Sequence, residues 1–132
     1  MTKLDLKGNP GSGWRDLTQL PESLGQFKNL VVINLGGSAR LKTLPASIGE
    51  LSEALENLNM NFCKSLKELP ENFGELKGLK ECWMAGCTSL TALPESFGKL
   101  QALTILELSG CSSLRKQPEI LQQLPSACKI YR

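Results

Sequence analysis

The chain has 132 residues, with 15 basic and 13 acidic side chains, a formal net charge of +2 and no histidine. This length suits a single domain with one continuous core. The near balance of charge argues against nucleic-acid binding, which needs a basic excess gathered on one face. The absence of histidine excludes Ser-His-Asp and Cys-His catalytic pairs and histidine metal ligands. The sequence implies no cofactor.

The hydropathy pattern predicts no membrane-spanning segment, and we expect no membrane partner. No apolar run in the sequence approaches the ~20 residues that cross a bilayer. The first ten residues, MTKLDLKGNP, lack the apolar segment of a signal peptide. We therefore expect a cytoplasmic protein.

The first predicted element is a strand around Leu4 and Leu6, because apolar residues at i and i+2 are typical of a strand with one buried face. The same spacing recurs along the chain, in Ile33/Leu35, Leu58/Met60, Cys82/Met84 and Leu106/Leu108. Ala127 to Ile130 falls in phase with Leu103 to Leu106, so a sixth strand is predicted to begin there.

A glycine-rich insertion, Gly8 to Asp16, follows the first strand. Gly8 to Gly13 has the G-x-x-x-x-G spacing of a phosphate-binding loop, but that loop continues with Lys and Ser or Thr. Here Trp14 and Arg15 follow instead. We expect a bulge in which Trp14 packs on the coil formed by the first strand and the return after it. A nucleotide site is the alternative.

One hexapeptide then recurs four times, as LPESLG (20–25), LPASIG (44–49), LPENFG (69–74) and LPESFG (93–98). Proline fixes φ near −65° and has no N–H to donate, which suits a bend from a strand into a return segment. The closing glycine predicts a tight helical turn, with a positive φ as one option. An extra residue near Leu51 to Leu55 makes one repeat longer, and we expect it to loosen that turn without disturbing the sheet.

Five of the seven prolines are spaced 24, 25, 24 and 24 residues apart, namely Pro21, Pro45, Pro70, Pro94 and Pro118. A period of 24 with the form L-x-x-L-x-L-x-x-C/N-x-x-L falls within the range of leucine-rich repeats. Coils stacked about 4.8 Å apart would bury their leucines in one continuous column. The stretches ELSGCSSL (107–114) and LPESFGKLQAL (93–103) resemble the leucine-rich-repeat domains of plant intracellular nucleotide-binding immune receptors.

The resemblance implies an α/β leucine-rich-repeat solenoid, with a curved parallel sheet on the concave face and short turns, 3-10 or helical segments on the convex face. It also implies an innate-immunity-like role, although the nucleotide-binding part of such receptors does not occur in this sequence. We expect residues 1–132 to form a single domain of five repeats plus a partial sixth strand. Neither end carries an obvious polar cap, which predicts an excised piece of a longer protein, a minimal domain, or a chain that pairs through its ends.

Three of the five cysteines, Cys63, Cys87 and Cys111, share one position of the repeat. The resemblance implies that this side chain hydrogen-bonds to backbone at the turn leaving the strand. Zinc would need four converging ligands, whereas this spacing gives a linear column, so no metal site is expected. An odd number of cysteines without a CxxC motif argues against a disulfide framework. Cys128 is the candidate for a free, reactive thiol.

The residues between the inward-facing apolar positions are expected on the exposed concave face. Trp83 falls in the middle of that face, and tryptophan is enriched at interface hot spots. The alternative is that Trp83 merely covers neighbouring coils and that Phe62 turns partly inward. The candidate partner-binding residues are Lys3, Asp5, Val32, Asn34, Asn57, Asn59, Asn61, Glu81, Trp83, Ile105 and Glu107.

These observations favour a non-catalytic recognition module that binds a protein or peptide through the concave sheet. The alternative is a structural or self-associating repeat fragment of a larger receptor-like protein. An enzyme would need carboxylate chemistry. The candidates, Glu81 and Glu107, fall one coil apart in different columns, and the sequence implies no pocket between them. A cation bound between these two carboxylates is no better supported. The sheet would offer about 400 Å², against about 800 Å² per partner in a standard interface, so loops or further repeats would have to contribute.

Overall fold

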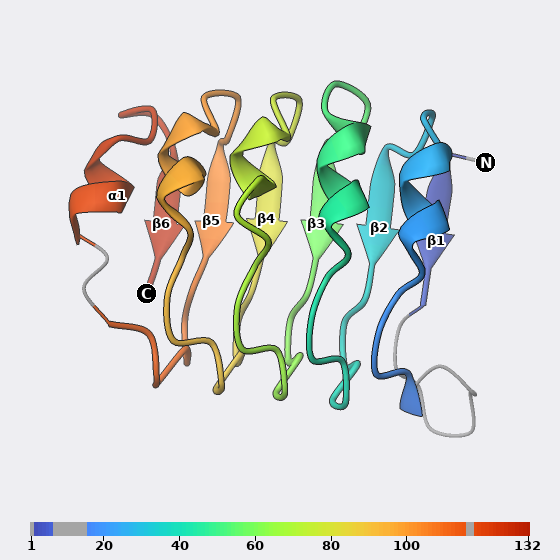
Figure 1. Ribbon diagram of the computed structural model, residues 1–132. Helices are drawn as coiled ribbons and strands as arrows, with labels where there is room; N and C mark the ends of the chain where they lie inside the picture. Colours follow the sequence, from blue (N-terminus) through green and yellow to red (C-terminus); the bar gives the residue numbers. More distant parts are fainter. Residues whose placement is uncertain (1, 7–15, 116–117) are drawn as a thin grey trace.

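The structure, a computed structural model, describes residues 2–6, 16–115 and 118–132. Within them, six short strands form one parallel sheet in the order in which they occur along the chain (Figure 1). The strands are β1 (Lys3–Asp5), β2 (Val32–Asn34), β3 (Asn57–Asn59), β4 (Glu81–Trp83), β5 (Ile105–Glu107) and β6 (Lys129–Tyr131). Each strand and the return that follows it are called a coil here, numbered by the strand.

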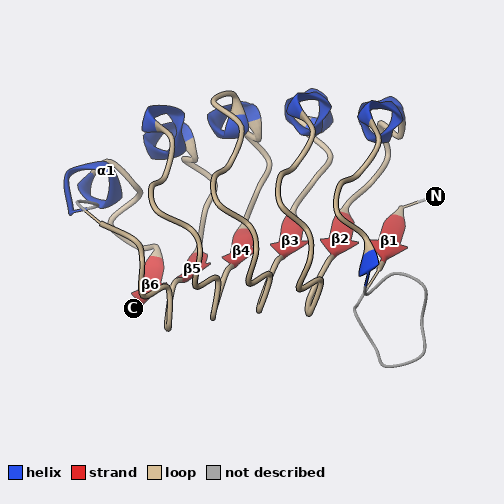
Figure 2. Ribbon diagram, turned by 60° about the horizontal axis from the view of Figure 1, so that its bottom comes forward, coloured by secondary structure: helices blue, strands red, loops and turns tan. Residues whose placement is uncertain are grey.

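The returns are short helical turns, as expected. Four are 3-10 helices, η2 (Glu22–Gln26), η3 (Ala46–Leu51), η4 (Phe73–Glu75) and η5 (Glu95–Lys99), and the fifth is α1 (Pro118–Gln122). Figure 2 shows the strands on one side of the molecule and the helical turns on the other, where the turns spread more widely. The sheet is therefore the concave side. None of the described helices has the length and apolar character needed to cross a membrane.

The burial of residues along each strand follows from the alternation of side chains between the two faces of the sheet. In each of the inner strands the central residue is fully buried and its two neighbours are partly exposed. Parallel pairing keeps equivalent residues in register across all six coils, so that Leu4 lies beside Ile33 and Leu106 beside Ile130. Because a slip of one residue would turn every buried side chain outward, this hydrophobic pattern fixes the register.

The core is a stack of equivalent side chains, one from each coil. Leu41, Leu66 and Leu90 are fully buried, and the Phe73 and Phe97 rings stack with their centroids 5.6 Å apart and their planes 3° apart. Phe27 departs from its buried equivalents, since 45% of it is exposed. It belongs to the coil at one end of the described stack, which has a described neighbour on one side only.

The recurring prolines act as predicted. Pro21, Pro45 and Pro94 precede a 3-10 helix with extended backbone and φ values of −72°, −68° and −67°. The option of a positive φ at the closing glycines of the hexapeptides is wrong. The described glycines with a positive φ are Gly37, Gly86 and Gly110, and none of them closes a hexapeptide. The closing glycines are required by close packing: a Cβ on Gly74 would collide with the carbonyl oxygen of Ser96 in the next coil.

The extra residue of the second coil widens the turn after η3, as predicted. The Leu55 N–H donates to the Leu51 carbonyl, four residues back, at 3.1 Å. The equivalent bond of the next coil, from Leu79 to Leu76, spans only three residues. The pairing of β2 with β3 is undisturbed, as predicted.

Most of the glycine-rich insertion lies outside the described residues. Its last residue, Asp16, has a carboxylate oxygen 3.8 Å from the Arg40 Nε, with both side chains largely exposed. The phosphate-loop spacing of Gly8 to Gly13 and the expected packing of Trp14 lie outside the described residues.

Candidate recognition face

The register aligns the predicted face residues in two columns along the sheet. The first column is Lys3, Val32, Asn57, Glu81, Ile105 and Lys129, and the second is Asp5, Asn34, Asn59, Trp83, Glu107 and Tyr131. Asn61 follows β3 in the turn beyond it. These side chains are exposed in the two outermost strands and partly exposed in the four inner ones. All eleven candidate residues are thus brought onto or beside one face.

Trp83 is held in place by a small hydrogen-bonded cluster. Its indole N–H donates to Glu81 Oε1 at 3.1 Å, and the Asn57 side-chain amide donates to the same oxygen at 3.3 Å. Trp83 is partly exposed, with Asn59 and Glu107 as its neighbours in the adjacent strands. The structure therefore fixes the indole ring against the sheet while leaving part of it accessible to a partner.

Several predicted contact residues already serve the fold. The side-chain oxygens of Asn34, Asn59 and Glu107 each accept the backbone N–H two residues later, at 3.0, 2.9 and 2.8 Å. Trp83 has no acceptor for the equivalent N–H of Ala85, and the Asn61 side-chain oxygen of the preceding coil accepts it at 2.8 Å. These oxygens close the turn after each strand, so their capacity to accept a bond from a partner is reduced.

Phe62 is a feature that the sequence analysis did not resolve. Of its side chain, 54% is exposed, and its φ of 62° places it in the left-handed region. The equivalent residues of the other inner coils are Gly37, Gly86 and Gly110, all with positive φ. The Phe62 ring lies over Gly86, where a Cβ would collide with it. A bulky residue with this backbone conformation is a genuine outlier, and such outliers cluster at functional sites.

We expect Phe62→Gly to be more stable than Phe62→Ala by about 1 kcal/mol, although glycine is normally the less stabilising residue. Both variants lose the ring, but only glycine adopts a positive φ without steric cost. Urea unfolding followed by circular dichroism measures the difference. The control pair is Lys67→Gly and Lys67→Ala, at an exposed position without a positive φ, where alanine should be equal or better. Equal stability of the two Phe62 variants would contradict the strain.

The repeated cysteine position behaves as the resemblance implies. The thiols of Cys63, Cys87 and Cys111 donate to the carbonyls of Leu35, Met60 and Met84, at 3.4, 3.1 and 2.9 Å. Each acceptor belongs to the preceding coil, so the column links neighbouring turns.

The cysteines differ in their expected reactivity. Burial raises the pKa of Cys63 to about 12 and also raises the pKa of Cys82. A hydrogen bond with the Cys87 thiol lowers the pKa of Cys111 to about 7, and the same bond, with burial, raises the pKa of Cys87. Cys128, the sequence candidate for a reactive thiol, has a pKa raised by desolvation. Cys111 is therefore expected to be the more reactive thiol, because its pKa is lowered and it is partly exposed.

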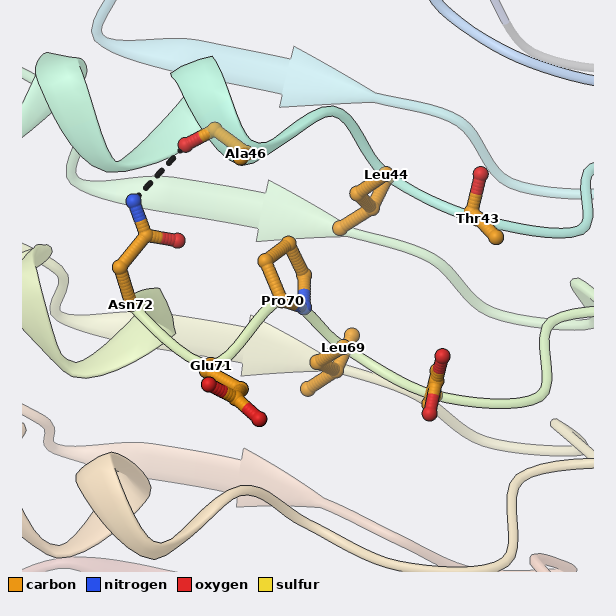
Figure 3. A pocket seen from close by; sticks show the side chains of 8 residues that line it. Thr43, Leu44, Ala46, Leu69, Pro70, Glu71 and Asn72 are labelled. Atoms are coloured by element: carbon orange, nitrogen blue, oxygen red, sulfur yellow. Dashed lines mark hydrogen bonds between the residues drawn. The ribbon is translucent and has the colours of Figure 1, made fainter.

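The surface grooves belong to the repeat architecture. One lies between the corner segments of coils 2 and 3, where the Asn72 side-chain amide donates to the Ala46 carbonyl at 2.8 Å (Figure 3). Similar grooves lie beside Pro94 and between η5 and α1. Among the described residues no group of three or more His, Cys, Asp or Glu side chains could hold a metal ion. A groove repeated with the coils is a consequence of their stacking.

Comparisons with known proteins agree with this geometry. A leucine-rich-repeat protein of Leptospira interrogans superposes with a TM-score of 0.62 and 25% identity, covering 90% of this chain and 38% of that one. The chain is a leucine-rich-repeat solenoid. The leucine-rich repeat domain of the type III effector XopL superposes with a TM-score of 0.55 and 23% identity, covering 87% of this chain and 57% of that one.

The sequence comparison matches part of the chain to a plant protein. A stretch of 55 residues is 38% identical to the disease resistance protein RPS4B of Arabidopsis thaliana. That stretch is 42% of the solenoid and 5% of the relative, so the match spans a small part of the relative's length. No family model matches the chain.

Proposed function

We propose that the solenoid is a non-catalytic recognition module that binds a protein or peptide through its concave face, centred on Trp83. Solenoids use their curvature to create extended concave binding surfaces. The observation that carries the proposal is the Trp83 indole, partly exposed and fixed by Glu81 in the middle of the sheet. A rigid aromatic side chain with few rotors to immobilise is the typical anchor of an interface hot spot.

The size of the sheet sets a condition on this proposal. Six strands of three residues offer roughly 250 Å², whereas a standard interface covers about 800 Å² on each partner. A partner must therefore also contact the turns beyond the strands. Phe62 supplies a second exposed aromatic ring there, lying against Gly86 in the same coil as Trp83. We include Phe62 with the eleven predicted contact residues.

The wider context belongs to the same proposal. We infer a cytoplasmic protein with a role in innate immunity, supported by the similarity of 55 residues to a protein named for disease resistance. We also infer that residues 1–132 act as one domain of five repeats with part of a sixth. The near-neutral charge and the polar-aromatic face favour a protein or peptide partner over nucleic acid or a membrane.

Substitution of Trp83 tests the site. Peptides selected on the wild-type chain from a displayed library should bind Trp83→Ala at least tenfold more weakly, a loss of about 1.4 kcal/mol or more. Fluorescence anisotropy with a labelled selected peptide measures the dissociation constant. Phe27→Ala is the matched control, because Phe27 is an exposed aromatic residue away from the strands. Unchanged affinity in a folded Trp83→Ala, Glu81→Ala double variant would count decisively against this face.

Self-association is the second candidate function. The outermost strands, β1 and β6, each have one neighbour in the described sheet, and an open strand edge is a template for pairing with another chain. Light scattering distinguishes the two functions, because a mass that stays monomeric over a wide concentration range removes self-association and leaves recognition unaffected.

A further inference from the structure

Coils 4 and 5 approach each other closely at the turn that follows their strands. The Gly86 N–H donates to the Ser109 carbonyl at 2.8 Å, and a Cβ on Gly110 would lie 3.4 Å from the Gly86 nitrogen. Cys87 and Cys111 are the next residues in the two coils. Their expected Cα separation is the strand spacing of about 4.8 Å, which lies within the range of about 4.4–6.8 Å that a disulfide spans.

The Cys111 sulfur is directed toward the turn that contains Cys87, whereas the Cys87 sulfur is directed toward the Met60 carbonyl of the coil before it. The Cys111 thiol donates to the Met84 carbonyl at 2.9 Å, and the backbone N–H of Cys87 donates to that same oxygen at 3.4 Å. Donation from the Cys87 thiol to the ionised Cys111 sulfur, in place of the Met60 carbonyl, is the main cause of the lowered pKa of Cys111. Cys87 is buried and Cys111 is partly exposed, so a reagent in solvent reaches Cys111 first.

We propose that Cys87 and Cys111 are a peroxide-sensitive thiol pair that closes to a disulfide linking coils 4 and 5. The Cys111 thiolate attacks one oxygen of hydrogen peroxide, forming an S–O bond as the O–O bond breaks, and the departing hydroxide takes a proton to become water. The Cys87 sulfur then attacks the Cys111 sulfenic acid, and the hydroxyl leaves with the Cys87 proton as a second water. Two thiols and one peroxide give one disulfide and two waters.

The other cysteines are poorer candidates for this chemistry. The thiolate is the nucleophile, and burial disfavours it at Cys63 and Cys82. Cys128 is partly exposed, but desolvation raises its pKa as well. Cys111 combines partial exposure and a stabilised thiolate with a second thiol at the equivalent position of the adjacent coil.

The disulfide would have a structural cost. It removes the thiol donors that now bond to the Met60 and Met84 carbonyls. The loss of these contacts offsets part of the stabilisation that the disulfide would give, which makes the disulfide easier to reduce than one formed without such a loss. The pair is therefore expected to be reversible, and this inference does not depend on the proposed binding function.

Peptide mapping tests the proposal on the full chain carrying Cys128→Ser, which removes one route to intermolecular disulfides. Hydrogen peroxide is added at pH 8 to protein that circular dichroism shows to be folded. Trypsin cleaves at Lys80, Lys99 and Arg115, so the expected product is a linked pair of peptides, 81–99 and 100–115, that dithiothreitol separates. Fragmentation of the linked pair must place the bond on Cys87 and not on Cys82, which lies in the same peptide. Absence of that linked pair, or linkage of a different pair of cysteines, would overturn the proposal whatever the variants do.

Three serine variants assign the roles. Cys111→Ser should abolish the linked pair, and the matched control Cys63→Ser, from the same column, should leave it unchanged. Cys87→Ser should leave Cys111 as a sulfenic acid that dimedone traps. The rate of peroxide consumption should fall as the pH is lowered through about 7, because protonation removes the Cys111 thiolate. A rate independent of pH between 5 and 9 would contradict Cys111 as the attacking group.

Discussion

Replacing Phe73 by alanine should lower the free energy of unfolding by about 3–5 kcal/mol. Phe73 is fully buried, and its ring stacks on Phe97 at 5.6 Å between centroids. Its loss leaves a cavity between two coils whose backbones are fixed by the sheet on one side and by η4 and η5 on the other. The surroundings therefore cannot collapse far, which places the cost toward the upper part of the range for large-to-small core substitutions.

Urea unfolding followed by far-ultraviolet circular dichroism measures this loss. Phe27→Ala is the matched control, because Phe27 occurs in the first coil with 45% of its side chain exposed. The control should cost about 1 kcal/mol or less, since surface substitutions away from special contacts have small effects. A loss below about 1 kcal/mol for Phe73→Ala would contradict the inter-coil stack.

The second large effect is expected at Gly74, where alanine should cost about 2–3 kcal/mol, the upper range for overpacking. The added Cβ would collide with the backbone oxygen and carbonyl carbon of Ser96, so no side-chain rotation relieves it. The Gly74 N–H also donates to Ser96 Oγ at 2.9 Å, and separating the coils would break that bond. The same unfolding measurement applies.

Gly36→Ala is the matched control for Gly74. A Cβ on Gly36 would come no closer than 3.2 Å to another atom, the Asn34 Oδ1, which is a side-chain atom. Neither glycine has a positive φ, so backbone strain does not distinguish them. If the two variants lose the same stability, close approach of coils 3 and 4 is not the reason for glycine in the hexapeptide.

Much of this fold could be predicted because one sequence pattern recurs in every repeat. The recurrence of leucines and prolines specifies a solenoid, and the i, i+2 spacing identifies Ile33, Leu58 and Leu106 as inward-facing residues of the strands. The role of the closing glycine could not be predicted in the same way. A glycine can be required by a positive φ or by close packing against the next coil. The sequence of one repeat does not give the distance to the next coil, so it cannot distinguish the two.

The candidate face shows the same division. Its two columns could be predicted because side chains alternate between the two faces of a strand and the repeat length is fixed. Glu81, Trp83 and Glu107 are therefore placed on the same face of the sheet. The hydrogen bonds by which Asn59 and Asn61 close turns were not predicted. The Asn59 side chain accepts the Asn61 N–H, and the Asn61 side chain accepts the Ala85 N–H of the next coil, where Trp83 has no acceptor to offer. Phe62 could have been found by one signal: it is the single non-glycine residue in the inner coils at the position otherwise held by Gly37, Gly86 and Gly110.

The most direct test of the account is to map a bound peptide on the chain by NMR. The backbone amide signals of the ¹⁵N-labelled solenoid are followed during titration with a peptide selected on the wild-type chain. The account predicts that the largest shifts fall on β3, β4 and β5 and on the Trp83 indole N–H. Shifts concentrated on η2 to η5, with the strand signals and the indole unchanged, would contradict recognition through the concave face.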